Sequence, residues 1–211
     1  MAGPNVAFRT LYDNLGELRY LFKNLNLISN TATATMATKR KIFEVFDHKK
    51  EETFSIEKSP ERPNIVYSIQ YIDDDLEFSD VFNEVISEVK ERKDKCTKTL
   101  VYCQTRKQAA IIWRTFKVAL GKDMYVGETM LPKDCIVEMF HAGTPESSKQ
   151  HILESVTLAD GHVKVLICTI AFSMGIDLKG ARKIINFCPS QTTEIGRVGR
   201  DGGLSLCILL R

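Results

Sequence analysis

A string rich in glycine and arginine, at 194–202, carries the clearest chemical signal in the sequence. It places Arg197 and Arg200 three residues apart, each preceded by a glycine. On a helix this spacing puts both guanidinium groups on one face. A guanidinium group donates two parallel hydrogen bonds to phosphate oxygens and can stabilise the charge that develops during phosphoryl transfer. Glycine has no side chain, so a nucleotide can approach its backbone closely. Alternatively, the two arginines lie at a helix end and contact only solvent.

A second string joins an apolar run to a polar loop. Residues 165–168 are apolar, and 169–177 then supply hydroxyls, a glycine and a carboxylate. Parallel α/β sheets bind ligands at the carboxyl ends of their strands. Thr169 could donate to a backbone phosphate, and Asp177 could accept from a ribose hydroxyl or pair with an arginine. Asp177 could equally be a loop cap.

From about residue 78, helical periodicity alternates with short apolar runs, which predicts an α/β fold with a parallel sheet covered by helices. Strands are expected at 64–72, 100–103, 136–140, 163–168, 183–188 and 204–210, and helices at 78–89, 109–120 and 145–158.

The first 58 residues have a different pattern. A single strand is expected at 25–29, between helices at 11–22 and 36–46, and Thr35 is the expected N-cap of the second helix. One strand cannot form a core. Residues 49–63 are charged and contain two prolines, so we expect a linker there and a domain boundary near Ser59.

Composition sets limits on function. The net charge of +2 neither demands nor excludes a polyanionic partner. The absence of an apolar run of about 18 residues, and of an apolar leader, predicts an intracellular protein without a membrane partner. Six separated cysteines without a CxxC pair predict no zinc or other metal site. Cys103, Cys168 and Cys207 lie in apolar runs and are expected to be buried thiols.

Several strings together resemble RecQ-like DNA helicases of superfamily 2. TIAFSMGID at 169–177 and EIGRVGRDG at 194–202 are similar to that family's motifs V and VI. The other matching strings are TATAT at 31–35 (motif III), RPN at 62–64 (between the lobes), LVYC with TR at 100–106 (motif IV), HAG at 141–143, and 8–19, which resembles the stretch after the family's DEAH box. They follow the family's order over essentially the whole chain.

The resemblance implies a fold and a set of roles. The fold would be a RecA-like parallel sheet with helices on both faces, at 59–211, preceded by a remnant of a first RecA-like lobe and linker at 1–58. The activity would be ATP-driven 3′ to 5′ translocation on DNA with duplex unwinding. The implied roles are ATP binding by Gly175, Asp177, Arg197 and Arg200, with catalysis by the two arginines; a DNA track at Arg106, His141 and Thr169; and coupling by Thr31 and Thr33.

The sequence also departs from the family. It contains neither a GxxxxGK[ST] string nor a DEAH-like string, so ATP with Mg²⁺ is expected to bind only with a complete first lobe. About four residues are missing between Pro189 and Glu194, Thr193 replaces a glutamine and Ser173 a glycine, and no zinc or winged-helix module follows Arg211. The alternative function is therefore a non-catalytic module that binds nucleic acid or protein. The family's partners would be single-stranded or forked DNA, in nuclear repair and recombination.

Overall fold

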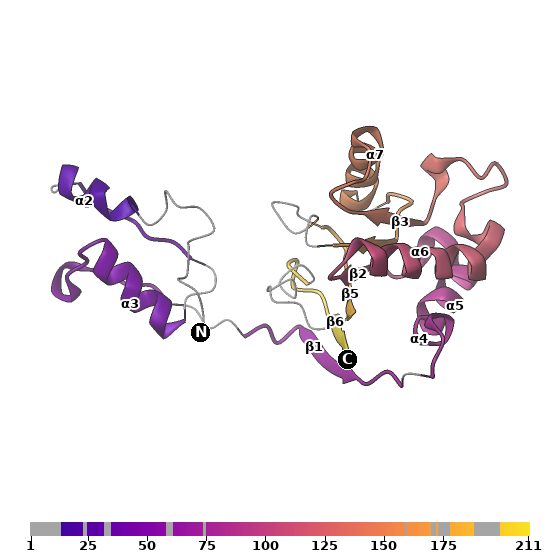
Figure 1. Ribbon diagram of the computed structural model, residues 1–211, viewed down its shortest axis with the longest axis horizontal. Coiled ribbons are helices and arrows are strands. Elements are labelled where there is room, and N and C mark those ends of the chain that lie inside the picture. The colour runs from indigo at the N-terminus through magenta and orange to yellow at the C-terminus, as the bar shows by residue number, and fades with distance from the viewer. Residues whose placement is uncertain are drawn as a thin grey trace. The chain divides into compact units, whose positions relative to one another are not determined.

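The computed structural model describes residues 14–22, 25–31, 35–57, 61–73, 75–158, 160–169, 172, 178–187 and 199–211. The chain divides into two compact units, residues 1–61 and 62–211 (Figure 1). All strands of the described chain belong to the second unit.

The first unit contains short helices. They are the 3-10 helix η1 (Asn14–Gly16), α2 (Glu17–Leu21), α3 (Met36–Val45) and the 3-10 helix η2 (Lys50–Glu52). Thr35 is the N-cap of α3, as expected, because its hydroxyl accepts a 3.1 Å hydrogen bond from the N–H of Thr38. This bond satisfies one of the backbone donors that a helix leaves free at its start.

The strand predicted at 25–29 is wrong. These residues have no regular secondary structure, and their side chains are exposed. A strand needs the backbone hydrogen bonds of a neighbouring strand, and the described part of the first unit offers none. No described residue of this unit is buried, and Ile28 is 91% exposed. The first unit therefore lacks a hydrophobic core within its described residues.

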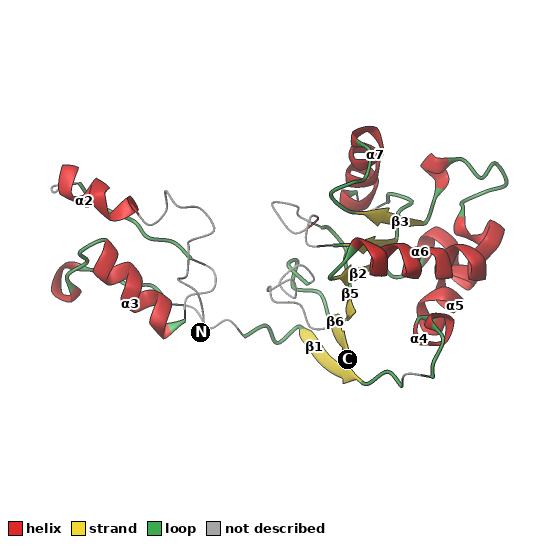
Figure 2. Ribbon diagram, viewed as in Figure 1, coloured by secondary structure: helices red, strands yellow, loops and turns green. Residues whose placement is uncertain are grey.

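The second unit is built on a parallel six-stranded sheet (Figure 2). Its strands are β1 (Ile65–Gln70), β2 (Thr99–Cys103), β3 (Val137–Phe140), β4 (Val165–Cys168), β5 (Lys183–Phe187) and β6 (Ser205–Leu210). They lie in the order β1-β6-β5-β2-β4-β3, and every neighbouring pair is parallel. All strands therefore begin at one edge, the amino edge, and end at the other, the carboxyl edge.

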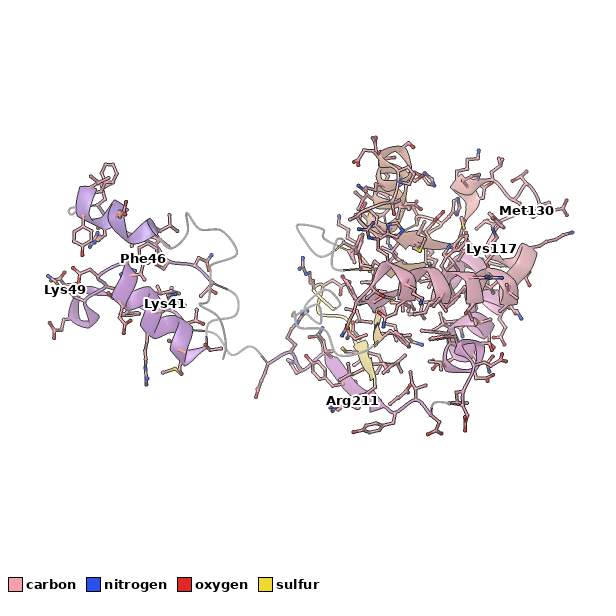
Figure 3. The ribbon with its side chains drawn as sticks, in the orientation of Figure 1. Lys41, Phe46, Lys49, Lys117, Met130 and Arg211 are labelled. Atoms are coloured by element: carbon pink, nitrogen blue, oxygen red, sulfur yellow. The ribbon has the colours of Figure 1, made fainter. Side chains whose placement is uncertain are left out.

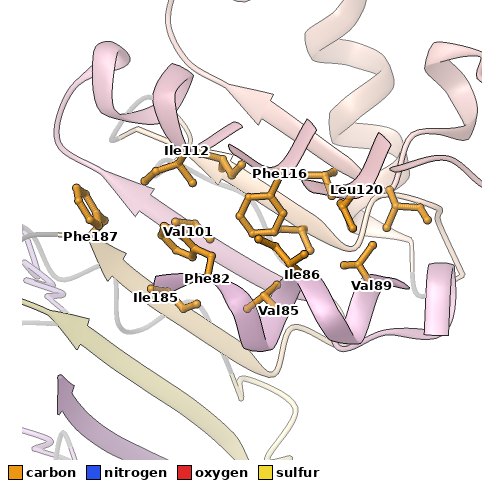
Figure 4. Close-up of a cluster of buried hydrophobic side chains, with 14 of the residues drawn as sticks. Phe82, Val85, Ile86, Val89, Val101, Ile112, Phe116, Leu120, Ile185 and Phe187 are labelled. Carbon is orange, nitrogen blue, oxygen red and sulfur yellow. The ribbon is translucent and has the colours of Figure 1, made fainter. Parts of the chain in front are cut away.

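Helices cover both faces of this sheet, which confirms the predicted fold class. The helices are α4 (Phe78–Val81), α5 (Asn83–Arg92), α6 (Arg106–Leu120) and α7 (Glu146–Thr157), with 3-10 helices η3 (Lys93–Lys95), η4 (Gly121–Met124) and η5 (Pro132–Asp134). Successive strand residues point to opposite faces. Val101 therefore packs with α5 and α6 (Figure 4), whereas Leu100 packs with α7.

The predicted helix at 78–89 is divided into α4 and α5 at Phe82. Phe82 is 1% exposed, and its ring centre lies 5.6 Å from that of Phe116 on α6. The buried stripe continues through Val85 and Val89, so the apolar spacing was predicted correctly although the helix is interrupted. Lys117 projects from α6 (Figure 3). Its Nζ lies over the ring of Trp113, 5.0 Å from the ring centre.

A buried lysine connects three segments near the amino edge. Lys98 is 5% exposed, and its Nζ donates to the carbonyl oxygens of Val156, Leu158 and Lys179 at 2.8, 2.7 and 3.1 Å. Two of these carbonyls belong to the end of α7, where the helix dipole favours a cation. Burial and the charge of Lys164 nevertheless lower the pKa of Lys98 to about 8.

The five cysteines in the described ranges are all buried, including the three for which burial was predicted: Cys96, Cys103, Cys135, Cys168 and Cys207. The described residues contain no group of three His, Cys, Asp or Glu side chains that could hold a metal ion. Within the same ranges, no helix is long and apolar enough to cross a membrane.

Candidate functional site at two edges of the sheet

Three residues predicted to contact DNA lie at the carboxyl edge of three neighbouring strands. Arg106 follows β2, His141 follows β3, and Thr169 follows β4. These strands are adjacent in the order β2-β4-β3, so parallel topology brings their ends together.

Arg106 and His141 meet around Gly143. A Cβ atom on Gly143 would lie 3.3 Å from Nη1 of Arg106 and 3.3 Å from Cε1 of His141. The guanidinium and the imidazole therefore flank one glycine that leaves room for both. This places two nitrogen-rich side chains side by side at the carboxyl edge.

The start of α6 is fixed by a capping box. Thr105 Oγ1 accepts from the N–H of Gln108 at 3.2 Å, and Gln108 Oε1 accepts from the N–H of Thr105 at 3.0 Å. Arg106 is the first residue of the helix, and its side chain is exposed. A helix start carries partial positive charge, so this arginine and the helix act on an anion in the same direction.

The local hydrogen bonds of His141 determine its tautomer. Nδ1 accepts from the N–H of Gly143 at 3.0 Å, so in a neutral ring the proton is on Nε2. The backbone N–H of His141 donates to Thr144 Oγ1, and the N–H of Thr144 donates to the His141 carbonyl, both at 3.0 Å. The loop is thus closed on itself, with Nε2 as the remaining ring donor.

Thr169 lies deeper than the other two residues. It is 6% exposed, its N–H donates to the Phe140 carbonyl at 3.2 Å, and its carbonyl accepts from Phe172 at 3.0 Å. Thr169 therefore joins the end of β3 to the loop after β4.

Arg200 lies at the opposite edge of the sheet. It belongs to a turn at 199–203 that leads directly into β6, so it is at the amino edge. Its side chain is exposed. The expectation that Arg200 shares a helical face with Arg197 is wrong for Arg200, because Gly199 has φ +61° and residues 200–201 form a turn. Arg197 lies outside the described residues.

Asn64 holds this turn. Its side-chain Nδ2 donates to the carbonyl oxygens of Gly199 and Gly203 at 2.8 and 3.0 Å. Its backbone carbonyl accepts from the N–H of Ser205 at 2.8 Å. Within the turn, the N–H of Gly202 donates to the Gly199 carbonyl at 3.1 Å. The residues on both sides of Arg200 are therefore anchored to the residue that precedes β1.

A two-bond ion pair anchors the turn a second time. Arg182, which precedes β5, donates through Nη1 and Nη2 to the two carboxylate oxygens of Asp201 at 2.7 and 2.8 Å. The hydrogen bond from Arg182, with one from the N–H of Gly203, lowers the pKa of Asp201 to about 2. Asp201 is thus ionised across the neutral range.

The structure does not show the remaining predicted site residues next to the groups at either edge of the sheet. Thr31 is exposed in the first unit. Thr33, Gly175 and Asp177 lie outside the described residues. Sequence reasoning missed the roles of Asn64 and Arg182 in the turn. No local pattern could have identified Asn64, because its side-chain partners lie 135 and 139 residues further along the chain.

The chain is similar to known proteins over nearly its whole length. Residues 80–202 match the family model described as "Helicase conserved C-terminal domain". "Probable ATP-dependent DNA helicase RecS" of Bacillus subtilis (strain 168) is 30% identical over 209 residues, which are 97% of this chain and 38% of that protein. "ATP-dependent DNA helicase RecQ" of Pasteurella multocida (strain Pm70) is 26% identical over 199 residues, which are 92% of this chain and 27% of that protein. The chain spans well under half the length of these relatives.

A solved structure, S. cerevisiae Dbp5 bound to RNA and ADP BeF3, matches with a TM-score of 0.64 and 18% identity, over 98% of this chain and 50% of that one. This likeness shows the RecA-like fold of a helicase C-terminal lobe. The chain belongs to the helicase conserved C-terminal domain family, and over nearly its whole length it matches helicases of the RecQ type.

Proposed function

We propose that this chain supplies the second RecA-like lobe of an ATP-dependent DNA helicase of RecQ type, and that residues 1–58 belong to the first lobe and the linker. The family match and the relatives support this proposal. The observation that carries it is the grouping of Arg106, His141 and Thr169 at three neighbouring strand ends.

The carboxyl edge suits the phosphate backbone of a single strand. Arg106 offers a guanidinium at a helix start, and His141 offers Nε2–H from a closed loop. Such donors bind phosphates whatever the base sequence, and their contribution falls as salt rises. Thr169, with little exposed surface, would orient the loop and contribute at most one hydroxyl contact.

ATP would be bound elsewhere on the lobe. We assign Arg200, with Arg197, to the γ-phosphate, and Gly175 and Asp177 to the nucleotide. Arg200 lies at the opposite edge of the sheet from Arg106, His141 and Thr169. Thr31 and Thr33, on the first-lobe side, would couple nucleotide binding to DNA binding. Translocation from 3′ to 5′ and unwinding of forked DNA are the finer parts of the proposal. ATP with Mg²⁺ would bind only with a complete first lobe.

Binding of single-stranded DNA tests the carboxyl-edge assignment. Fluorescence anisotropy with a labelled oligonucleotide should show that Arg106→Ala lowers affinity and reduces the slope of log affinity against log salt by about 0.7. Arg114→Ala, an exposed arginine further along α6, is the matched control and should leave both unchanged. Equal affinities for wild type and Arg106→Ala would refute the assignment. An RNA oligonucleotide of the same sequence measures the preference between the two nucleic acids.

The second candidate function is a non-catalytic nucleic-acid-binding or protein-interaction module. The absence of a GxxxxGK[ST] string from these 211 residues favours it for the isolated chain. DNA-stimulated ATP hydrolysis separates the two candidates. We expect no turnover by the chain above that of its Arg200→Ala variant, and turnover only when a first lobe is supplied. Failure of a supplied first lobe to restore hydrolysis would favour the non-catalytic module. A nuclear location, and roles in repair and recombination, remain proposals that follow from the family.

A further inference from the structure

We propose that Asn64 is a positioning residue for Arg200: its side-chain amide sets the shape of the turn at 199–203 and thereby aims the arginine at a phosphate. This inference rests on the proposed function, because it takes Arg200 to be a phosphate ligand. It adds a residue outside the glycine-arginine string to the phosphate site. Asn64 touches no phosphate itself and would act only through the turn.

The two acceptors of Asn64 lie on either side of Arg200. The Gly199 carbonyl comes one residue before the arginine, and the Gly203 carbonyl three residues after it. One NH₂ group therefore bridges the two ends of the turn. A backbone hydrogen bond, from the Ser205 N–H to the backbone carbonyl of Asn64, holds the start of β6 next to the same residue.

The turn has little rigidity of its own. Three of its five residues are glycines, at 199, 202 and 203. Glycine loses more conformational freedom on ordering than any other residue, so a turn of this composition keeps one shape only where contacts impose it. The contacts that do so include the Asn64 amide, the Arg182–Asp201 pair and the backbone bond from Gly202 to Gly199. Two further bonds hold Gly203, whose N–H donates to Asp201 Oδ1 and whose carbonyl accepts from Ser205 Oγ, both at 3.1 Å.

The type of residue at 64 matters because both partners are carbonyl oxygens. Asparagine has two amide N–H donors, whereas aspartate has none and would place charge beside two acceptors. Alanine would leave both carbonyls without this donor. Serine keeps one donor on a shorter side chain and should retain part of the effect.

A double-mutant cycle on the full chain tests the inference. The probe is inorganic tripolyphosphate, with binding followed by ³¹P NMR titration. We expect Arg200→Ala to weaken binding about tenfold, the loss typical of one charge-assisted contact, and Asn64→Ala to weaken it about fivefold. In the Arg200→Ala background, Asn64→Ala should have no further effect, because Asn64 acts through the arginine. Asn64→Ser should fall between wild type and Asn64→Ala.

Controls separate the possible failures. Asn83→Ala, at an exposed asparagine on α5, should leave binding unchanged, and thermal unfolding of each variant shows whether it folds. If Asn64→Ala does not fold, Asn64→Ser carries the cycle. No effect of Arg200→Ala would overturn the arginine assignment in the proposed function and the inference with it. A clear effect of Arg200→Ala, combined with no effect or an additive effect of the Asn64 variants, would overturn the inference alone.

Discussion

Gly199 and Asn64 are in direct contact at the amino edge of the sheet. Asn64 Nδ2 donates to the Gly199 carbonyl at 2.8 Å, and a Cβ atom on Gly199 would lie 2.4 Å from the same nitrogen. Gly199 also has φ +61°, a region that side chains disfavour. Position 199 therefore requires glycine for two separate reasons, one in the backbone and one in the neighbour.

We predict that Gly199→Ala lowers the free energy of unfolding by about 2 to 3 kcal/mol, from the backbone conformation together with the collision. Gly127→Ala is the matched control, because Gly127 has φ +85° but nothing within 4 Å of its Cβ position. It should lose about 1 kcal/mol, from the backbone alone. Urea unfolding measures both. Equal losses of unfolding free energy in the two variants would mean that the Asn64 side chain moves away from the added methyl group without destabilising the fold.

We predict that Lys98→Met lowers the free energy of unfolding by about 2 kcal/mol at pH 7, because three carbonyl oxygens lose their donor. The exposed Lys90→Met is the control and should change stability little. Chemical denaturation of the two variants measures the difference. A loss no larger than that of the control would show that water replaces the amine at no cost.

The same lysine predicts a dependence on pH. Its pKa is lowered in the folded chain to about 8, from an ordinary value of 10.5. The folded state then binds fewer protons than the unfolded state between these values, so the contribution of Lys98 to stability rises as pH increases from about 8 to 10.5 and is lost as pH falls through 8. The stability gap between wild type and Lys98→Met should widen from pH 7 to pH 10. Parallel curves of the free energy of unfolding against pH for the two proteins would contradict this prediction.

The sequence predicted the second unit well because each of its elements buries an apolar stripe. The spacing of Ala109, Ile112 and Phe116 identified α6, and continuous apolar runs identified the central strands. The same reasoning failed at 25–29, where the run was apolar but no neighbouring strand existed among the described residues. An apolar run indicates burial only where a partner surface is present.

Long-range contacts had no such signal. Asn64 and Gly203 are 139 residues apart, and no local pattern connects them. The spacing of Arg197 and Arg200 predicted a shared helical face, whereas Arg200 lies in a turn that precedes β6 at the amino edge. By contrast, Arg106, His141 and Thr169 each follow a strand, and adjacency of those strands was all that their grouping required.

We predict that Cys96 and Cys135 do not react with iodoacetamide in the folded chain at pH 8. Burial, with the nearby charge of Glu88 for Cys96 and Glu138 for Cys135, raises the pKa of each thiol to about 12. Only about one thiol in ten thousand is then ionised at pH 8, and the thiolate is the reactive form. Peptide mass spectrometry before and after denaturation in urea measures the labelling, with exposed Lys122→Cys as the reference thiol. Labelling of the native chain at the reference rate would refute the prediction.

We predict that Asp201 stays ionised at pH 3.8, where an ordinary aspartate is half protonated. Arg182 and the N–H of Gly203 lower its pKa to about 2. A depressed pKa means that the pair contributes stability above pH 3.8 and loses it as pH falls through about 2. The ¹³C carboxyl shift of Asp201 measures the titration directly.

Removing the partner should return this titration toward its usual range. In Arg182→Ala the bidentate hydrogen bonds are absent, so the midpoint for Asp201 should move up toward 3.8, with the Gly203 bond retaining a small part of the shift. An unchanged midpoint would mean that the backbone, and not Arg182, holds the carboxylate. The side-chain contacts that then hold the turn from outside would be those of Asn64 and of Ser205, whose Oγ donates to the Gly203 carbonyl at 3.1 Å.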